Sequence, residues 1–172
     1  VVNAAAGQAA YTSFEADGGG GWTIPSGSRD TGSITGSLCY NLSNGATSFS
    51  GLNPSTSYVV SYWSKAGSYA VSGQTHLMQG KTIGLWTYYE HSVSGVSAVS
   101  VVGGGDVDEL RLYPQNAQMT TYTYNPLVGI SSQCDVGNRV TYYYYDPLSR
   151  LNVVKDQDGN IIKTLGYHYK NQ

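Results

Sequence analysis

Charged residues are scarce in this chain. Only 12% of its 172 residues are Asp, Glu, Lys or Arg, and the formal net charge is −2, whereas about 25% is usual for globular domains. Nucleic-acid binding without sequence preference requires a basic surface. We therefore expect no nucleic-acid partner.

Long apolar runs and helical periodicity are also missing. No stretch approaches the ~20 apolar residues that span a bilayer, so we expect no membrane span. No window of ~11 residues repeats its apolar side chains with the 3.6-residue period of a helix. No signal peptide opens the chain, and residues 1–10 look like the interior of a longer precursor. The two cysteines, Cys39 and Cys134, have no metal-ligand spacing and form no disulfide framework, and the spacing leaves open whether they pair.

Glycine and tyrosine are abundant, with 22 and 16 residues. Frequent Gly/Ser/Asn turns between short runs of β-formers predict an all-β protein. The low charge and the Tyr/Ser/Thr/Gly-rich texture favour an extracellular or cell-surface setting.

The segment 107–114 (VDELRLYP) marks a boundary in the chain. It follows the glycines 103–105, alternates apolar and polar residues, and stops at Pro114. This pattern predicts a half-buried strand with Leu110 and Leu112 inward and Glu109 and Arg111 outward. We expect one domain over residues 1–114 and a smaller section over 115–172.

The first section contains about eight short strands with frequent turns, which predicts a β-sandwich or jelly roll. The longest strand signal covers residues 58–65. Tyr58, Val60 and Tyr62 fall on one of its faces, and Val59, Ser61, Trp63 and Lys65 fall on the other. Either set could be the inner one, and an error of one residue would exchange the two faces.

Several segments of residues 11–114 together resemble the jelly-roll carbohydrate-binding modules. They are Phe14-Glu15 with a following Gly-Trp, Gly36-Ser37-Leu38 at the start of a strand, Gly51-Leu52 ahead of residues 58–63, Trp86–Tyr89, and residues 107–112. The resemblance implies a two-sheet sandwich, often with a structural Ca²⁺ ion and a concave face that binds glycans.

The resemblance also implies positions for the ion. Glu15 and Asp108 match the family's carboxylates, and carbonyl oxygens would come from Thr35 or Ser37, or from the region of Asp17. Oxygen ligands of this kind suit Ca²⁺. In the alternative interpretation, Glu15 and Asp108 are solvated carboxylates at the rim.

A glycan-binding face would combine an aromatic ring with polar neighbours. The residues opposite the inferred core that fit this description are Trp63, Lys65, Tyr88, Glu90 and Arg111. Trp63 belongs equally well to the core, and Trp22 and Trp86 fit better as seals at the sandwich edge. No HExxH, GxSxG or phosphate-loop pattern occurs, and Asp106, Asp108 and Glu109 have no partner acid across a cleft. We therefore expect no enzyme activity.

The second section is repetitive. Residues 122–130 (YTYNPLVGI) recur as 143–151 (YYYDPLSRL), Gly137-Asn138 is echoed by Gly159-Asn160, and a third start follows at 167–170. Periods of this size indicate arrays of small units, here β-hairpins. Tyr145-Asp146, Arg150-Leu151 and Asp158-Gly159-Asn160 resemble the tyrosine–aspartate (YD) repeats of the RHS family, although the first copy has Asn125 in place of the Asp and Gly129-Ile130 in place of Arg-Leu.

Together, these resemblances imply an extracellular, non-enzymatic module of a larger RHS-type protein that binds a polysaccharide or cell-surface glycan through one sheet. The alternative is a structural or assembly module without a ligand, whose YD hairpins pair with other chains through exposed strand edges.

Overall fold

The structure is a computed structural model of the chain and describes residues 8–16, 18–27 and 29–168. Asp17, Tyr169 and Lys170, and most of the segment 1–10, lie outside the described residues. The chain divides into two compact units, the first reaching to Met119 and the second starting at Thr120. This division falls a few residues after the boundary expected at Pro114.

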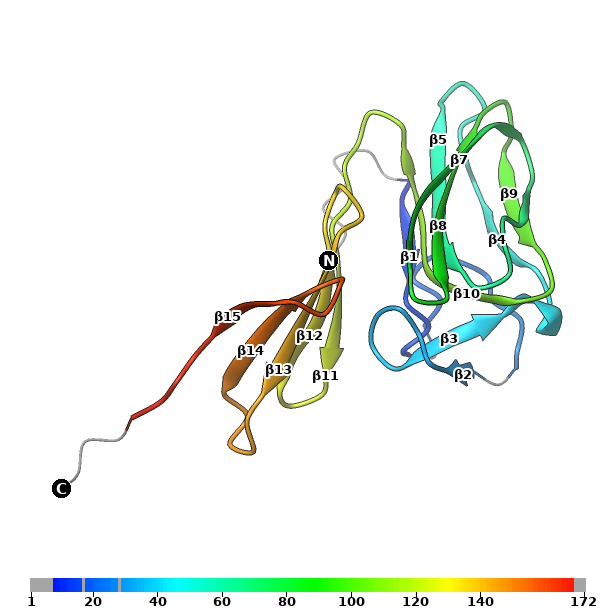
Figure 1. The fold of residues 1–172 in the computed structure, drawn as a ribbon. Helices are drawn as coiled ribbons and strands as arrows, with labels where there is room; N and C mark the ends of the chain where they lie inside the picture. The colour runs from blue at the N-terminus through cyan, green and yellow to red at the C-terminus, as the bar shows by residue number, and fades with distance from the viewer. Residues whose placement is uncertain (1–7, 17, 28, 169–172) are drawn as a thin grey trace. The chain divides into compact units, whose positions relative to one another are not determined.

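The all-β prediction is confirmed (Figure 1). Across the described residues, the one helical element is a 3-10 turn, η1 (Leu42–Asn44), and no helix is long and apolar enough to cross a membrane. The strands of the first unit are β1 (Ala10–Thr12), β2 (Arg29–Thr31), β3 (Leu38–Asn41), β4 (Thr47–Ser50), β5 (Tyr58–Ser64), β6 (Ala70–Val71), β7 (Gln74–Ile83), β8 (Trp86–Val93), β9 (Ala98–Val102) and β10 (Asp106–Pro114). Those of the second are β11 (Thr121–Asn125), β12 (Gly129–Cys134), β13 (Val140–Tyr145), β14 (Leu151–Asp156) and β15 (Ile161–Thr164).

Two antiparallel sheets form the first unit. The larger has the order β2-β3-β10-β5-β8-β7, with β1 also paired to β10, and the smaller has the order β4-β9-β6. Side chains from both sheets build one hydrophobic cluster between them, including Tyr62 and Leu112 from the larger sheet and Val99 and Val101 from the smaller. The first unit is therefore a β-sandwich with its core between the sheets.

The inward positions predicted for Leu110 and Leu112 are confirmed, and the structure settles which face of residues 58–65 is the inner one. Leu110 and Leu112 are fully buried in the core, as are Tyr58, Val60 and Tyr62. Glu109 and Arg111, expected outward, are buried as an ion pair with 2.9 Å between Oε2 and Nη2. The outward side chains of the strand are therefore not exposed to solvent, because polarity reports the face of a strand but not what covers it.

Strand β10 changes partners along its length. It pairs with β5 throughout, while its other edge pairs first with β3, through Asp106 and Val107, and then with β1, from Leu110 to Leu112. A β-bulge separates the two parts, and Glu109 lies within it at φ 54°. Bulges of this kind redirect side chains and are common next to functional sites.

Other boundaries differ from expectation for local reasons. Residues 35–37 form a turn ahead of β3 instead of the start of a strand, because their backbone groups bind carboxylates. Phe14 adopts φ 62° and stands outside β1. Strand β7 continues to Ile83, with register shifts that carry Gly80 over the ring of Tyr88. A Cβ at Gly80 would lie 2.8 Å from that ring, so this close approach requires glycine.

The second unit is a five-stranded antiparallel meander in the order β11-β12-β13-β14-β15. Three of its turns share one design, in which an Asp carboxylate accepts the backbone N–H groups two and four residues later. Asp135, Asp146 and Asp156 play this part, and Arg139, Arg150 and Asn160 complete each turn with a side-chain bond to the same carboxylate. The second copy of the sequence repeat thus contains two turns of this type, at Asp146 and Asp156, and the first copy contains one, at Asp135.

A buried histidine makes the stability of the first unit depend on pH. His91 is fully buried, with Nε2 2.8 Å from the Tyr62 hydroxyl and Nδ1 2.7 Å from Oε1 of Gln74. Burial lowers the pKa of His91 from 6.5 to about 4. His91 is therefore protonated at a higher pH in the unfolded chain than in the folded protein. The stabilisation that neutral His91 contributes to the folded state is present above pH 6.5 and is lost as pH falls toward 4.

We expect the free energy of unfolding to fall by about 2 kcal/mol between pH 6.5 and 5 through this group alone. Urea unfolding of the wild type and of His91→Gln measures the contribution as the difference between the two pH profiles. His76→Gln, at an exposed position of β7, is the matched control and should keep the wild-type slope. Parallel profiles for the wild type and His91→Gln would contradict the assignment.

Candidate functional site

The outer face of the larger sheet, turned away from the core, carries one continuous row of side chains. Strand register places Tyr11, Arg111, Ser61, Glu90 and Met78 opposite one another across β1, β10, β5, β8 and β7. Directly opposite residues share a face. Trp63 and Tyr88 form the adjacent pair, with ring centroids 5.5 Å apart. The structure therefore brings four of the five residues expected to bind glycan onto one part of this face.

These side chains do not form an open platform. Trp63, Tyr88 and Arg111 retain 1%, 4% and 2% of their surface, so the expectation of exposed side chains is wrong for all three. Trp63 packs on Tyr88, Gly80 of β7 lies against Tyr88, and Arg111 is held by Glu109. Glu90 is half-buried and accepts a hydrogen bond of 3.0 Å from the Tyr88 hydroxyl.

The indole N–H of Trp63 is a buried polar group on this face. Its Nε1 makes no hydrogen bond among the residues that the structure describes, and it is one of several buried polar atoms of which this is true. A buried N–H without an acceptor typically costs about 1–3 kcal/mol. Such a group points either to a bound acceptor or to stability given up at a functional position.

Lys65 lies apart from the row, at the end of β5. Its Nζ is 2.9 Å from Oδ2 of Asp106 and 4.7 Å from the centre of the Trp86 ring. About a quarter of the side chain is exposed. The fifth residue of the expected platform is thus engaged in a separate polar cluster with β10.

Two buried carboxylates occupy the β10 bulge. Asp108 accepts backbone N–H groups from Ile34, Thr35 and Glu109 at 2.7 to 3.0 Å. The Glu109 carboxylate accepts the hydroxyls of Tyr11 and Thr35 at 2.6 and 2.7 Å. Burial, followed by the neighbouring charge of Glu109, raises the pKa of Asp108 well above its usual range. Arg111 forms an ion pair with Glu109 and thereby places a buried base beside the two acids.

Glu15 binds the same turn from its other end. Its Oε1 accepts the N–H groups of Ser37 and Leu38 at 2.7 and 2.6 Å. Gly36, directly before Ser37, has φ 62°, and a Cβ at this position would lie 2.5 Å from the Glu15 carboxyl. Glu15, Thr35, Ser37 and Asp108, the four residues expected to ligate Ca²⁺, are therefore brought together around Gly36.

The donor chemistry of this turn is mixed. Thr35 and Ser37 present N–H groups to the carboxylates, where the resemblance implied carbonyl oxygens. Within the described ranges, no group of three or more His, Cys, Asp or Glu side chains is gathered around a metal position. Asp17 lies outside the described residues. In the structure, the hydrogen bonds that Glu15 and Asp108 accept hold this turn.

The second unit exposes large apolar side chains. The most exposed are Tyr124, Leu127, Val136, Leu148, Ile161 and Ile162, each with more than half of its surface accessible. Two of them, Ile161 and Ile162, begin β15, which is an end strand of its sheet. Exposed apolar residues on an open strand edge favour pairing with another strand.

No protein-family model matches this chain, and a search of curated proteins finds no match. Both family resemblances therefore remain predictions drawn from the residues. Tyr11 and Asn41 carry no sequence signal of a site, and they enter the polar clusters only through strand pairing. Cys39 and Cys134 are both buried.

Proposed function

We propose that this chain is a structural and assembly module of a larger extracellular RHS-type protein, with a carbohydrate-binding-module-like jelly roll followed by YD-repeat hairpins. The single observation that carries the proposal is the exposed apolar edge strand β15, with Ile161 and Ile162 about 60% accessible. The occupant we propose is the sheet edge of a second copy. Its backbone would satisfy the open edge, and its side chains would cover the isoleucines.

The open edge gives a direct test of assembly. We expect light scattering to show a mass that rises with protein concentration, and Ile162→Lys to abolish the rise, because a charge on an edge strand opposes pairing. Leu85→Lys makes the same change at a comparably exposed position of the first unit and should associate like the wild type. A wild type that stays monomeric at all concentrations would reject the proposal.

Glycan binding by the outer face is the second candidate. It is favoured by the buried, unpartnered Nε1 of Trp63, which lies on the same face as Tyr88, Glu90 and Arg111. An N–H donor beside an aromatic ring suits a sugar, which offers both hydroxyl acceptors and an apolar face. Access of a sugar to this site is limited by strand β7, whose Gly80 lies against Tyr88.

We expect a glycan array to identify a polysaccharide or cell-surface glycan for which Trp63→Phe lowers affinity about tenfold, since the change removes one hydrogen bond and keeps the ring. Trp22→Phe removes an equally unpartnered Nε1 in the core and should leave binding unchanged. An array without any binder, obtained with folded protein, would leave assembly as the function.

We also propose that a structural Ca²⁺ ion is held at the Gly36 turn, with Glu15 and Asp108 as carboxylate ligands and Thr35 and Ser37 as neighbours. The support is electrostatic: Asp108 and Glu109 are buried beside a single paired Arg111. A divalent cation would offset this excess negative charge and join the start of the chain to β10.

The calcium proposal predicts a thermal unfolding midpoint several degrees higher with Ca²⁺ than with chelator, because an ion at a hundred times its Kd stabilises by about 2.7 kcal/mol. Glu15→Gln should remove most of the difference, whereas Glu90→Gln, on the outer face, should preserve it. Identical midpoints with Ca²⁺ and with chelator for the wild type would refute the proposal.

A further inference from the structure

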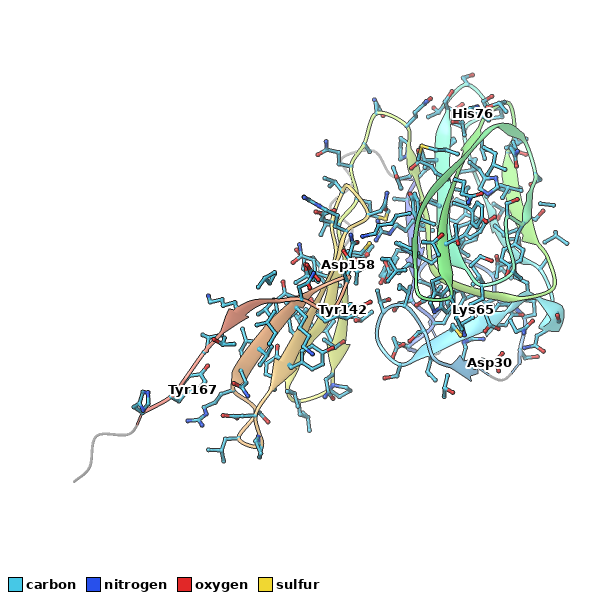
Figure 2. The ribbon with its side chains drawn as sticks, viewed as in Figure 1. Asp30, Lys65, His76, Tyr142, Asp158 and Tyr167 are labelled. Carbon is cyan, nitrogen blue, oxygen red and sulfur yellow. The ribbon has the colours of Figure 1, made fainter. Side chains whose placement is uncertain are left out.

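A lysine, an aspartate and an asparagine stand in line across three neighbouring strands. Asn41 on β3 is directly opposite Asp106 on β10. On the other edge of β10, the N–H of Lys65 faces the carbonyl of Asp106, one position beyond the Ser64–Val107 pair. Figure 2 shows Lys65 toward the end of the sandwich that carries Asp30, with His76 toward the opposite end.

The Asp106 carboxylate bridges the other two side chains. Its Oδ2 accepts a hydrogen bond of 2.9 Å from Nζ of Lys65, and its Oδ1 accepts one of 3.1 Å from Nδ2 of Asn41. One carboxylate thus touches both an amine and an amide nitrogen. A general base within this reach can take a proton from the first and return it to the second.

The Asn41 amide is also polarised from its other side. Its Oδ1 accepts the backbone N–H of Ser43 at 3.0 Å, in the cap of η1. Because Oδ1 accepts from one neighbour and Nδ2 donates to another, the orientation of the amide follows from its contacts. A backbone N–H in this position stabilises the negative charge that develops on the oxygen when the amide carbon is attacked.

The distance between Asn41 and Lys65 allows a bond between their side chains. Asn41 and Lys65 flank β10 on opposite sides, so their backbones are about two strand spacings, or roughly 10 Å, apart. A lysine side chain reaching toward an asparagine side chain covers that distance. Lys65 is held in place by Asp106 and by the Trp86 ring, whose Nε1 is itself fixed by the carbonyl of Gly32 at 3.2 Å.

We propose that Lys65 and Asn41 join in an intramolecular amide cross-link, with Asp106 as the proton-transfer residue. The Lys65 amine, after giving a proton to Asp106, attacks Cγ of Asn41. The attacking nitrogen then gives up a second proton, the tetrahedral intermediate collapses and the Cγ–Nδ2 bond breaks. Asp106 returns one proton to Nδ2, which leaves as ammonia, and the other proton is taken up by that ammonia as ammonium, so Asp106 ends as the carboxylate. One C–N bond forms and one breaks, with no change in oxidation state, so the reaction requires no oxidant, metal or cofactor.

Asn41, and not Asp106, is the acyl partner. An ionised carboxylate is a poor electrophile, and Asp106 is hydrogen-bonded to Lys65 as its counter-ion. Direct condensation with Asp106 would also remove the base from the reaction and would release water in place of ammonia. The two outcomes therefore differ in mass.

The protonation of Lys65 sets the rate. Burial lowers the pKa of Lys65, but the hydrogen bond and charge of Asp106 outweigh this effect and leave the pKa above its usual value. The free amine is therefore a small fraction at neutral pH, and cross-linking should be slow there and accelerate as pH rises. The product links β3 to β5 across β10 and fixes three strands covalently.

Intact-mass spectrometry of the folded 172-residue chain, incubated at several pH values, tests this inference. We expect a species lighter by one ammonia that accumulates with time, and a proteolytic digest that contains a branched peptide joining Lys65 to Asn41. Retention of the full sequence mass after prolonged incubation at raised pH would overturn the proposal. Loss of one water with a Lys65–Asp106 peptide would overturn the assignment of Asn41.

Variants separate the cross-link from other losses of ammonia. Lys65→Arg keeps the charge and should give no branched peptide, Asp106→Asn should slow the reaction at least tenfold, and Lys163→Arg on the exposed strand β15 should react like the wild type. Asn44-Gly45 can lose ammonia by cyclising on its own backbone, but that product forms equally in Lys65→Arg and yields no branched peptide. Ammonia loss in Lys65→Arg that equals the loss in the wild type would therefore reject the cross-link.

Discussion

The bulge of β10 is the constraint on which the first unit depends. At Asp108 and Glu109 the strand stops pairing with β3 and begins pairing with β1, and both carboxylates face protein on every side. Their charge is met by backbone N–H groups, two hydroxyls and Arg111. Buried carboxylates are tolerated only when they are paired in this way. The turn at Gly36, the start of the chain and the last strand of the sandwich are consequently fixed by one polar cluster.

The second unit uses carboxylates in a different way. Asp135, Asp146 and Asp156 each close a hairpin turn by accepting N–H groups from within it. These hydrogen bonds join residues within the same turn, so each turn forms independently of the rest of the chain. The turns do not bury apolar side chains, and Ile161 and Ile162 remain accessible on the end strand. A sheet with well-formed turns and an open apolar edge is suited to continuing into further strands.

The same strand, β10, organises every site proposed for the first unit. It contributes Arg111 to the row on the outer face and Asp108 to the cluster at the Gly36 turn. It also contributes Asp106, which bridges Asn41 and Lys65. Each of these residues acts through neighbours more than 40 positions away in sequence. A cross-link between β3 and β5 would therefore reinforce the strand that the remaining polar groups already share.

Alternation and turn chemistry were sufficient to predict an all-β chain, the inward positions of Leu110 and Leu112, and the repeated hairpins, because these features follow from local spacing along a strand. Alternation also showed that Tyr58, Val60 and Tyr62 share a face, but it did not show whether that face is the inner one. Resemblance placed Glu15, Thr35, Ser37 and Asp108 in one neighbourhood, and the structure brings them together. Local pattern did not reveal that Trp63, Tyr88 and Arg111 are buried, or that Asp106 connects Lys65 to Asn41. The sequence by itself thus determined which residues share a face. Only tertiary structure decided what lies against that face, because burial and strand pairing join segments whose separation along the chain carries no periodic signal.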